Sequence, residues 1–315
     1  MVIGNWSFGI KHILMLHLSK LGLGTVELGL PYGLSSPSLP SDKEAETILK
    51  SALELGITYF DTARAYGLAE ERLGKFGIST APGVTVGTKC GQFLKKEPDI
   101  SSEELEKRIR QEIDESRRNL KLDILPLVQF HLESPDFNRL PELTEIAFEL
   151  KEEGTVENFG IAGRGEPVPL ETIQTGQYAS IQCAYSILDQ RMNSKVLPSA
   201  QEKNIAVINR SVLLKGTLTG KRNSLPPQLS PLLENANKAE TIAQELGVTL
   251  PDLAIRFAAS NPAITTILIG TVKPEHLASA TKAIEAGPLS EEILQKLYKL
   301  AIQNPNQIDP ALWPQ

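Results

Sequence analysis

The chain has 315 residues, of which 41% are hydrophobic and 22% charged, and its formal net charge is −6. This composition is that of an ordinary globular domain, and the acidic balance argues against general nucleic-acid binding. No apolar stretch approaches the roughly 20 residues that a helix needs to cross a bilayer, so no membrane partner is expected.

Strand-like and helical segments alternate along the chain. The first strand is expected over residues 19–25, and a Gly-, Pro- and Ser-rich loop then leads into a helix over residues 43–56. Ser41 or Asp42 is the expected N-cap of that helix, and Gly56 ends it. Further strands are expected over residues 57–61, 84–89, 123–131, 156–163, 178–186, 205–210 and 264–270. Further helices are expected over residues 68–77, 101–122, 141–154, 169–176, 194–204, 238–247, 250–262, 274–286 and 290–303.

Eight such units without a linker predict an α/β fold, a (β/α)8 TIM barrel that forms a single domain over residues 19–315. A doubly wound open sheet is the alternative, but no G-x-G-x-x-G follows the first strand. Residues 1–18 lack the clean apolar core and cleavage site of a secretory signal, so the expected location is the cytoplasm. This N-terminal extension, of uncertain order, is expected either to be poorly ordered or to cover the barrel floor.

Cysteine and histidine usage points away from disulfides and metals. Cys90 and Cys183 each lie within or just past a strand-like run, and two cysteines are too few for a disulfide framework. We expect both to be buried as small hydrophobic residues. The four histidines form no cluster at ligand spacing, so no metal site is expected.

Four polar residues fall where a parallel barrel builds its active site. Asp61, Lys89 and His131 each end a strand-like run, and Tyr66 lies on the loop after the first of these runs. A free phenol, with a pKa of about 10, donates a proton poorly at neutral pH, but a nearby Lys lowers that pKa. A carboxylate keeps the Lys charged, and a His can bind the substrate oxygen or relay the proton.

Such a set suits proton transfer to an oxygen that becomes negative as hydride arrives at its carbon, which is carbonyl reduction. Each of the four residues taken singly also fits a structural role: a turn cap, a solvated charge, a rim packing residue or a core histidine. The catalytic hypothesis therefore depends on their joint placement.

Segments spread from residue 21 to about residue 285 resemble the aldo-keto reductase family. The most specific are FDTARAYG and the downstream GTK; LGLGTVELG, VQFHLESP, IQCAYSILDQ, LLKGTLTGK, LAIRFAASNP and IGTVKPEHL support them. The resemblance implies that Tyr66 is the general acid, that Lys89 and Asp61 tune it, and that His131 orients the carbonyl. VGTKCG and LGLGTVELGLPYG are most similar to the sugar-dehydrogenase branch, the L-galactose and threo-aldose dehydrogenases.

The same resemblance implies a nicotinamide cofactor that lies extended across the barrel mouth. It places Gly24 and Thr25 at the first-strand turn, Asp61 beside the ribose, Gln182 at the nicotinamide carboxamide and Arg210 stacked on the nicotinamide. The pyrophosphate path would be lined by Ser211, Leu213, Gly216 and Leu218. The adenosine end would meet Gly270, Thr271, Lys273 and His276.

Two cofactor positions depart from the family pattern. The Ser-Asn pair usual after the fifth strand is replaced by Ala162 and Gly163, where Arg164 or backbone groups are the possible substitutes. The usual Lys and Arg for the 2′-phosphate align with Gly270 and His276, which leaves Lys273 as the nearest cation. The expected cofactor is NADP, with NAD as the alternative.

The leading hypothesis is therefore an NAD(P)-dependent oxidoreductase that interconverts an aldehyde, ketone or sugar with its alcohol or lactone. The expected partner is a small-molecule carbonyl or sugar; the sequence leaves the preferred substrate, the direction and the oligomeric state open. One alternative is a nucleotide-binding regulatory or scaffold subunit with little turnover. Another is a barrel enzyme that acts on a phosphate-bearing substrate without a nicotinamide.

Overall fold

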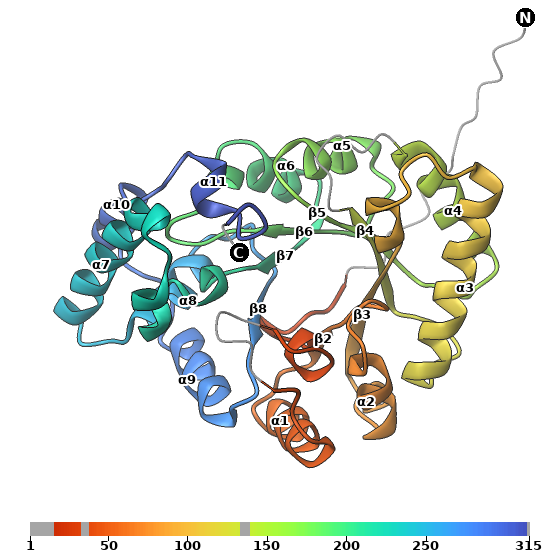
Figure 1. The fold of residues 1–315 in the computed structure, drawn as a ribbon, viewed down its shortest axis with the longest axis horizontal. Coiled ribbons are helices and arrows are strands. Elements are labelled where there is room, and N and C mark those ends of the chain that lie inside the picture. Colours follow the sequence, from red (N-terminus) through yellow and green to blue (C-terminus); the bar gives the residue numbers. More distant parts are fainter. Residues whose placement is uncertain (1–15, 33–37, 133–138, 314–315) are drawn as a thin grey trace, which may run out of the picture.

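The computed structural model describes residues 16–32, 38–132 and 139–313. Eight parallel strands close into a barrel in chain order, and helices surround it, as predicted (Figure 1). The strands are β1 Leu21–Gly24, β2 Tyr59–Asp61, β3 Thr85–Cys90, β4 Leu127–Leu132, β5 Phe159–Gly163, β6 Ser180–Ala184, β7 Ala206–Arg210 and β8 Thr266–Gly270. The helices are α1 Asp42–Glu54, α2 Ala69–Lys75, α3 Ser102–Leu120, α4 Leu140–Glu152, α5 Pro167–Thr175, α6 Val196–Glu202, α7 Ser230–Glu245, α8 Leu250–Ala259, α9 Pro274–Glu285, α10 Glu291–Tyr298 and α11 Pro305–Ile308.

Local sequence signals explain where α1 begins and ends. Ser41 accepts from the backbone N–H of Glu44, and the Glu44 carboxylate accepts from the Ser41 N–H, which makes a capping box. Gly56 follows the helix with a φ of +76°, a conformation that a residue without a Cβ adopts at little cost. The expected cap at Ser41 and the expected stop at Gly56 are both confirmed.

Helix α7 begins at Ser230, eight residues before the expected start at residue 238. The earlier turns carry Leu232 and Ala236, which are buried in register with Ala239 and Ala243. Positions spaced by three and four residues form one apolar stripe, which packs on the core and extends the helix toward its N-terminus. The prediction missed this start, and it also missed the short tail helix α11.

A large aromatic residue, Tyr59, lies inside the barrel, where two glycines leave room for its ring. A Cβ on Gly22 would lie 2.8 Å from Cδ1 of Tyr59, and a Cβ on Gly87 would lie 2.4 Å from its hydroxyl oxygen. Tyr59 packs there with Leu127, Ile208 and Leu268, and Leu16 and Leu18 pack against this cluster. These two leucines belong to the expected N-terminal extension, whose residues 1–15 lie outside the described part of the chain.

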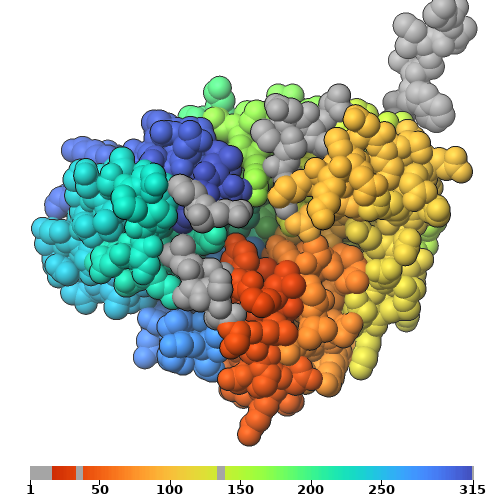
Figure 2. All heavy atoms as spheres, in the orientation of Figure 1, coloured from red at the N-terminus to blue at the C-terminus, as the bar shows by residue number. Residues whose placement is uncertain are grey.

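The main core lies between the strands and the surrounding helices. Cys90 and Cys183 are free thiols buried in it, as expected. The space-filling view shows the segment after β1, in red, and the C-terminal segment, in dark blue, both reaching toward the middle of this face (Figure 2). Among the described residues, no helix is long and apolar enough to cross a membrane.

Candidate active site

Asp61 and Lys89 form a buried ion pair at the C-terminal ends of β2 and β3. The Lys89 Nζ lies 2.5 Å from Oδ2 of Asp61 and donates to the carbonyl oxygen of Thr62 at 2.9 Å. Burial by itself lowers the pKa of Lys89, but Asp61 and then Tyr66 outweigh it, so that pKa lies above its usual value. Lys89 is therefore held as an ammonium at neutral pH.

Tyr66 and His131 lie beside this pair. The Lys89 Nζ is 5.0 Å from the centroid of the Tyr66 ring, and the proximity of Tyr66 contributes to the raised pKa of Lys89 after the larger effect of Asp61. The ring of His131, from the end of β4, meets the Tyr66 ring edge to face, with 6.4 Å between centroids and an interplanar angle of 88°. The structure thus brings together all four residues that the sequence singled out.

The second oxygen of Asp61 accepts from three further side chains. Gln182 Nε2 donates to Oδ1 at 2.7 Å, Gln129 Nε2 lies at 3.4 Å, and the Tyr59 hydroxyl lies at 3.5 Å. Burial, followed by the charge of Asp61, raises the pKa of Tyr59 well above its usual value, so Tyr59 stays a neutral donor.

Tyr59 and Gln129 are absent from the sequence-based prediction, although a signal for them exists. Each precedes a predicted residue by two positions, Asp61 on β2 and His131 on β4. Side chains two apart on a strand point to the same face, so both were candidates for the barrel interior.

The loop that carries Tyr66 is held by backbone contacts on two sides. The N–H of Thr62 donates to the Gly87 carbonyl at 2.8 Å and that of Arg64 donates to the Lys89 carbonyl at 3.0 Å, which prolongs the pairing with β3. On the other side, a Cβ on Gly29 would lie 1.7 Å from the carbonyl oxygen of Tyr66. Only glycine fits at that contact.

At the barrel mouth, the side chain of Arg210 contacts Gly163 and Ser211. Its Nη2 donates to the Gly163 carbonyl at 3.1 Å, and its Nη1 lies 3.4 Å from the Ser211 hydroxyl. The guanidinium therefore reaches from the end of β7 to the end of β5, where the family's Ser-Asn pair is missing. On β1, Gly24 ends the strand, and the buried Thr25 hydroxyl donates to the Asp61 carbonyl at 3.0 Å.

The loop after β7 has an unusual backbone. Ser211, Leu214, Lys215 and Gly216 have φ values of 61°, 44°, 52° and 93°. Non-glycine residues seldom adopt such values, and they gather at ligand clamps, where turned backbone N–H groups can face an anion. Leu218 is fully buried and Leu213 half-buried, so both anchor the loop to the core.

At the predicted adenosine end, Gly270 terminates β8 and is exposed. The Thr271 hydroxyl lies 2.9 Å from Nδ1 of His276 and accepts from the N–H of Lys273 at 3.1 Å, while the Lys273 side chain is exposed. Glu27, absent from the prediction, approaches within 3.8 Å of a Cβ built on Gly270. Its burial raises its pKa, and Lys221 opposes that shift.

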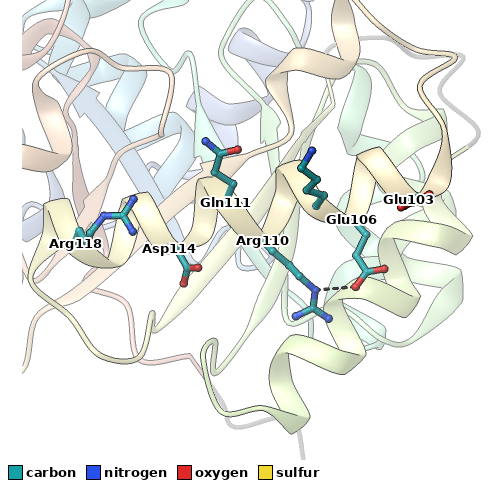
Figure 3. A pocket seen from close by; sticks show the side chains of 7 residues that line it. Glu103, Glu106, Arg110, Gln111, Asp114 and Arg118 are labelled. Atoms are coloured by element: carbon teal, nitrogen blue, oxygen red, sulfur yellow. Dashed lines mark hydrogen bonds and ion pairs between the residues drawn. The ribbon is translucent and has the colours of Figure 1, made fainter.

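A hollow on the outer wall of α3 is lined by Gln111 and by charged side chains, of which Arg110 pairs with Glu106 (Figure 3). Arg110 donates to Glu106, Glu149 and Glu153 at 2.7–2.9 Å, which ties α3 to α4. A smaller hollow at the ends of β5, β6 and β7 is lined in part by Arg164, Arg191 and Arg210. The outer hollow reflects helix packing, and the residues suited to chemistry lie at the strand ends.

A family model described as "Aldo/keto reductase family" matches residues 20–302. The chain belongs to the aldo-keto reductase family. It is 29% identical to L-galactose dehydrogenase of Arabidopsis thaliana over 95% of this chain and 94% of the relative, and 27% identical to NADH-specific methylglyoxal reductase of Escherichia coli over 85% and 90%. The solved holo form of aldo-keto reductase AKR11C1 from Bacillus halodurans superposes with a TM-score of 0.74, at 27% identity over 91% of this chain and 93% of that one.

Membership of the aldo-keto reductase family makes the chain an NAD(P)-dependent oxidoreductase. The resemblance to the family that FDTARAYG and GTK indicated is confirmed, and the sugar-dehydrogenase branch is represented among the relatives.

Proposed function

We propose that this aldo-keto reductase interconverts an aldehyde, ketone or sugar with its alcohol or lactone, with Tyr66 as the general acid and base. The observation that carries the proposal is the buried Asp61–Lys89 pair, whose ammonium lies 5.0 Å from the centroid of the Tyr66 ring. A positive charge held at this place favours the phenolate and so lets the phenol release a proton near neutral pH.

Each side chain then has one task. In reduction the Tyr66 hydroxyl gives its proton to the carbonyl oxygen, and the Lys89 ammonium stabilises the phenolate that remains. Asp61 holds the ammonium in place, and His131 orients the substrate oxygen beside the phenol. When bound, the nicotinamide supplies hydride in reduction and accepts it in oxidation. In the direction of oxidation the Tyr66 phenolate takes the proton from the alcohol.

The proposed cofactor path follows the strand ends. Gly24, Thr25 and Asp61 would border the ribose, and Gln182 and Arg210 the nicotinamide. Ser211, Leu213, Gly216 and Leu218 would line the pyrophosphate path, and Gly270, Thr271, Lys273 and His276 the adenosine end. The left-handed backbone of the loop after β7 supports this path.

We propose NADP as the preferred cofactor, by a modest margin. Lys273 is an exposed cation at the start of α9, where a 2′-phosphate would gain a charge-assisted contact. Glu27 next to Gly270 acts against an added phosphate. The Escherichia coli relative is NADH-specific, so both cofactors belong in the assay.

The test follows the near-ultraviolet absorbance of reduced cofactor. NADPH and NADH are assayed over a carbonyl panel that includes methylglyoxal, and NADP and NAD over a sugar panel that includes L-galactose. Tyr66→Phe is expected to lower kcat by at least about a hundredfold while cofactor affinity stays within about twofold. Tyr298→Phe, on α10, is the matched control and should retain activity.

Two results would contradict the proposal. Turnover by Tyr66→Phe near the wild-type rate would remove Tyr66 as the proton donor. Tight nucleotide binding by the wild-type protein, without turnover of any panel member, would favour a regulatory subunit instead.

A further inference from the structure

A second buried carboxylate, Glu70, lies behind the Tyr66 loop and has no part in the proposed proton transfer. It sits in the first turn of α2, four residues after Tyr66, and its side chain is 0% exposed. Its Oε1 accepts from the Thr88 hydroxyl at 2.6 Å. Its Oε2 accepts from Arg64 Nη1 at 3.4 Å and from Asn119 Nδ2 at 3.2 Å.

Two of these partners flank the catalytic residues in the chain. Thr88 is the neighbour of Lys89 on β3, and Arg64 lies two residues before Tyr66. The backbone N–H of Arg64 also donates to the Lys89 carbonyl at 3.0 Å. One carboxylate thus ties the strand that carries the ammonium to the loop that carries the phenol.

The groups around Glu70 differ in how strongly they can hold the loop. Arg64 also meets Glu115 through Nε at 2.7 Å, but Glu115 is 31% exposed and water screens that pair. Cys90, the last residue of β3, has a pKa raised well above its usual value, first by burial and then by Glu112 and Glu70. Of the two carboxylates that Arg64 contacts, Glu70 is 0% exposed and Glu115 is 31% exposed, so Glu70 is the one shielded from solvent.

We propose that Glu70 is a positioning residue that sets the distance between the Tyr66 hydroxyl and the Lys89 ammonium. It acts through Thr88 on one side and Arg64 on the other, and touches neither substrate nor cofactor. The inference deepens the proposed function and rests on it, because it presupposes that Tyr66 and Lys89 act together. A displacement of about 1 Å in such a pair can lower a rate about a hundredfold.

Glu70→Gln is the first test, because it keeps the size of the side chain, removes the charge that faces Arg64, and leaves one acceptor oxygen where the carboxylate accepts on two sides. We expect kcat to fall by at least about tenfold, with KM and the dissociation constant for NADPH within about twofold of wild type. The basic limb of the kcat–pH profile should also shift, which a purely structural role would not cause. Glu115→Gln, which removes the outer carboxylate of the same arginine, is the matched control and should leave kcat within about twofold.

A second pair of variants keeps the test decisive if Glu70→Gln fails to fold. Thr88→Val removes the hydroxyl that donates to Glu70 and keeps the shape of the residue, whereas Thr88→Ser retains the hydroxyl. We expect Thr88→Val to reproduce the loss in kcat and Thr88→Ser to restore it. A folded Thr88→Val or Glu70→Gln variant with wild-type kcat and pH profile would overturn the inference, as would an equal loss in Glu115→Gln.

Tyr66→Phe separates this inference from the proposed function. If Tyr66→Phe is inactive while Glu70→Gln and Thr88→Val turn over normally, only the positioning role of Glu70 is wrong. If Tyr66→Phe keeps its turnover, the proposed function itself is wrong.

Discussion

Asp61→Asn should destabilise the protein more than Lys89→Met does, although both remove the same ion pair. Lys89 is 1% exposed, and Asp61 is the carboxylate that its ammonium contacts; its backbone acceptor, the Thr62 carbonyl, is neutral. Asp61 instead keeps the donors of Gln182, Gln129 and Tyr59 when the lysine is gone. Leaving a buried charge without its partner costs about 3–5 kcal/mol, so we expect Asp61→Asn to lose about that much at pH 7.

The deficit should depend on pH, and its sign follows from the pKa of Lys89. In the wild-type protein that pKa is raised in the folded state, so the stabilisation is fully present below the ordinary lysine value of 10.5 and is lost as the pH rises through the folded value. Without Asp61, burial dominates, and the folded pKa of Lys89 should fall below its unfolded value. The unfolded chain then binds more protons between the two values, so the stability of Asp61→Asn should rise with pH.

Urea denaturation followed by far-ultraviolet circular dichroism at pH 7 and pH 9.5 measures both effects. Wild type and Lys89→Met serve as references, and the double variant removes both charges. We expect the double variant to recover part of the loss of Asp61→Asn, because no uncompensated ammonium remains. A smaller loss in Asp61→Asn than in Lys89→Met, or a deficit equal at the two pH values, would refute the reasoning.

Three further outcomes are expected. Gly29→Ala should lower kcat and the melting temperature together, because its Cβ would meet the Tyr66 carbonyl oxygen at 1.7 Å; kinetics and thermal melts that match wild type would contradict this contact. Cys90 and Cys183 should resist a thiol reagent at pH 8 until urea unfolds the chain, because burial raises the pKa of Cys183 to about 12 and that of Cys90 well above its usual value. Rapid labelling of the native protein would show instead that the thiols are accessible. Lys273→Met should weaken NADPH binding by up to about fivefold and leave NADH binding unchanged, as fluorescence titration can measure; equal effects on both cofactors would remove its link to the 2′-phosphate.

Much of the fold follows from patterns within single segments. Each expected strand of the barrel has a counterpart in the structure, because short β-branched or apolar runs between capped amphipathic helices leave few other topologies. The boundaries are less well predicted. Helix α7 starts early because Leu232 and Ala236 join its buried stripe, and that stripe becomes visible only when the core that it contacts is known.

The sequence analysis missed residues whose surroundings are formed by distant segments of the chain. Glu70 reads in the sequence as an acidic residue in a first helical turn, a position that is usually solvated. It is buried because α2 packs closely on α3: a Cβ on Gly74 would lie 2.0 Å from the carbonyl oxygen of Asn119. The close contact brings Asn119 to the Glu70 carboxylate, and no spacing within either helix indicates it.

Asp61 shows why a strand-end motif reveals only part of such a site. Its carboxylate receives Lys89 from β3, Gln129 from β4, Gln182 from β6 and Tyr59 from its own strand. In a closed barrel the strands are tilted and staggered, so inward side chains of several strands meet at one level although their positions along the strands differ. The position of Asp61 at a strand end predicts that its carboxylate is an acceptor in the site, but the stagger of the strands determines which side chains donate to it. The carboxylate of Asp61 therefore receives four donors from four strands only because the barrel is closed. The sequence predicts that Asp61 pairs with Lys89, but the surroundings that hold this pair depend on the whole fold.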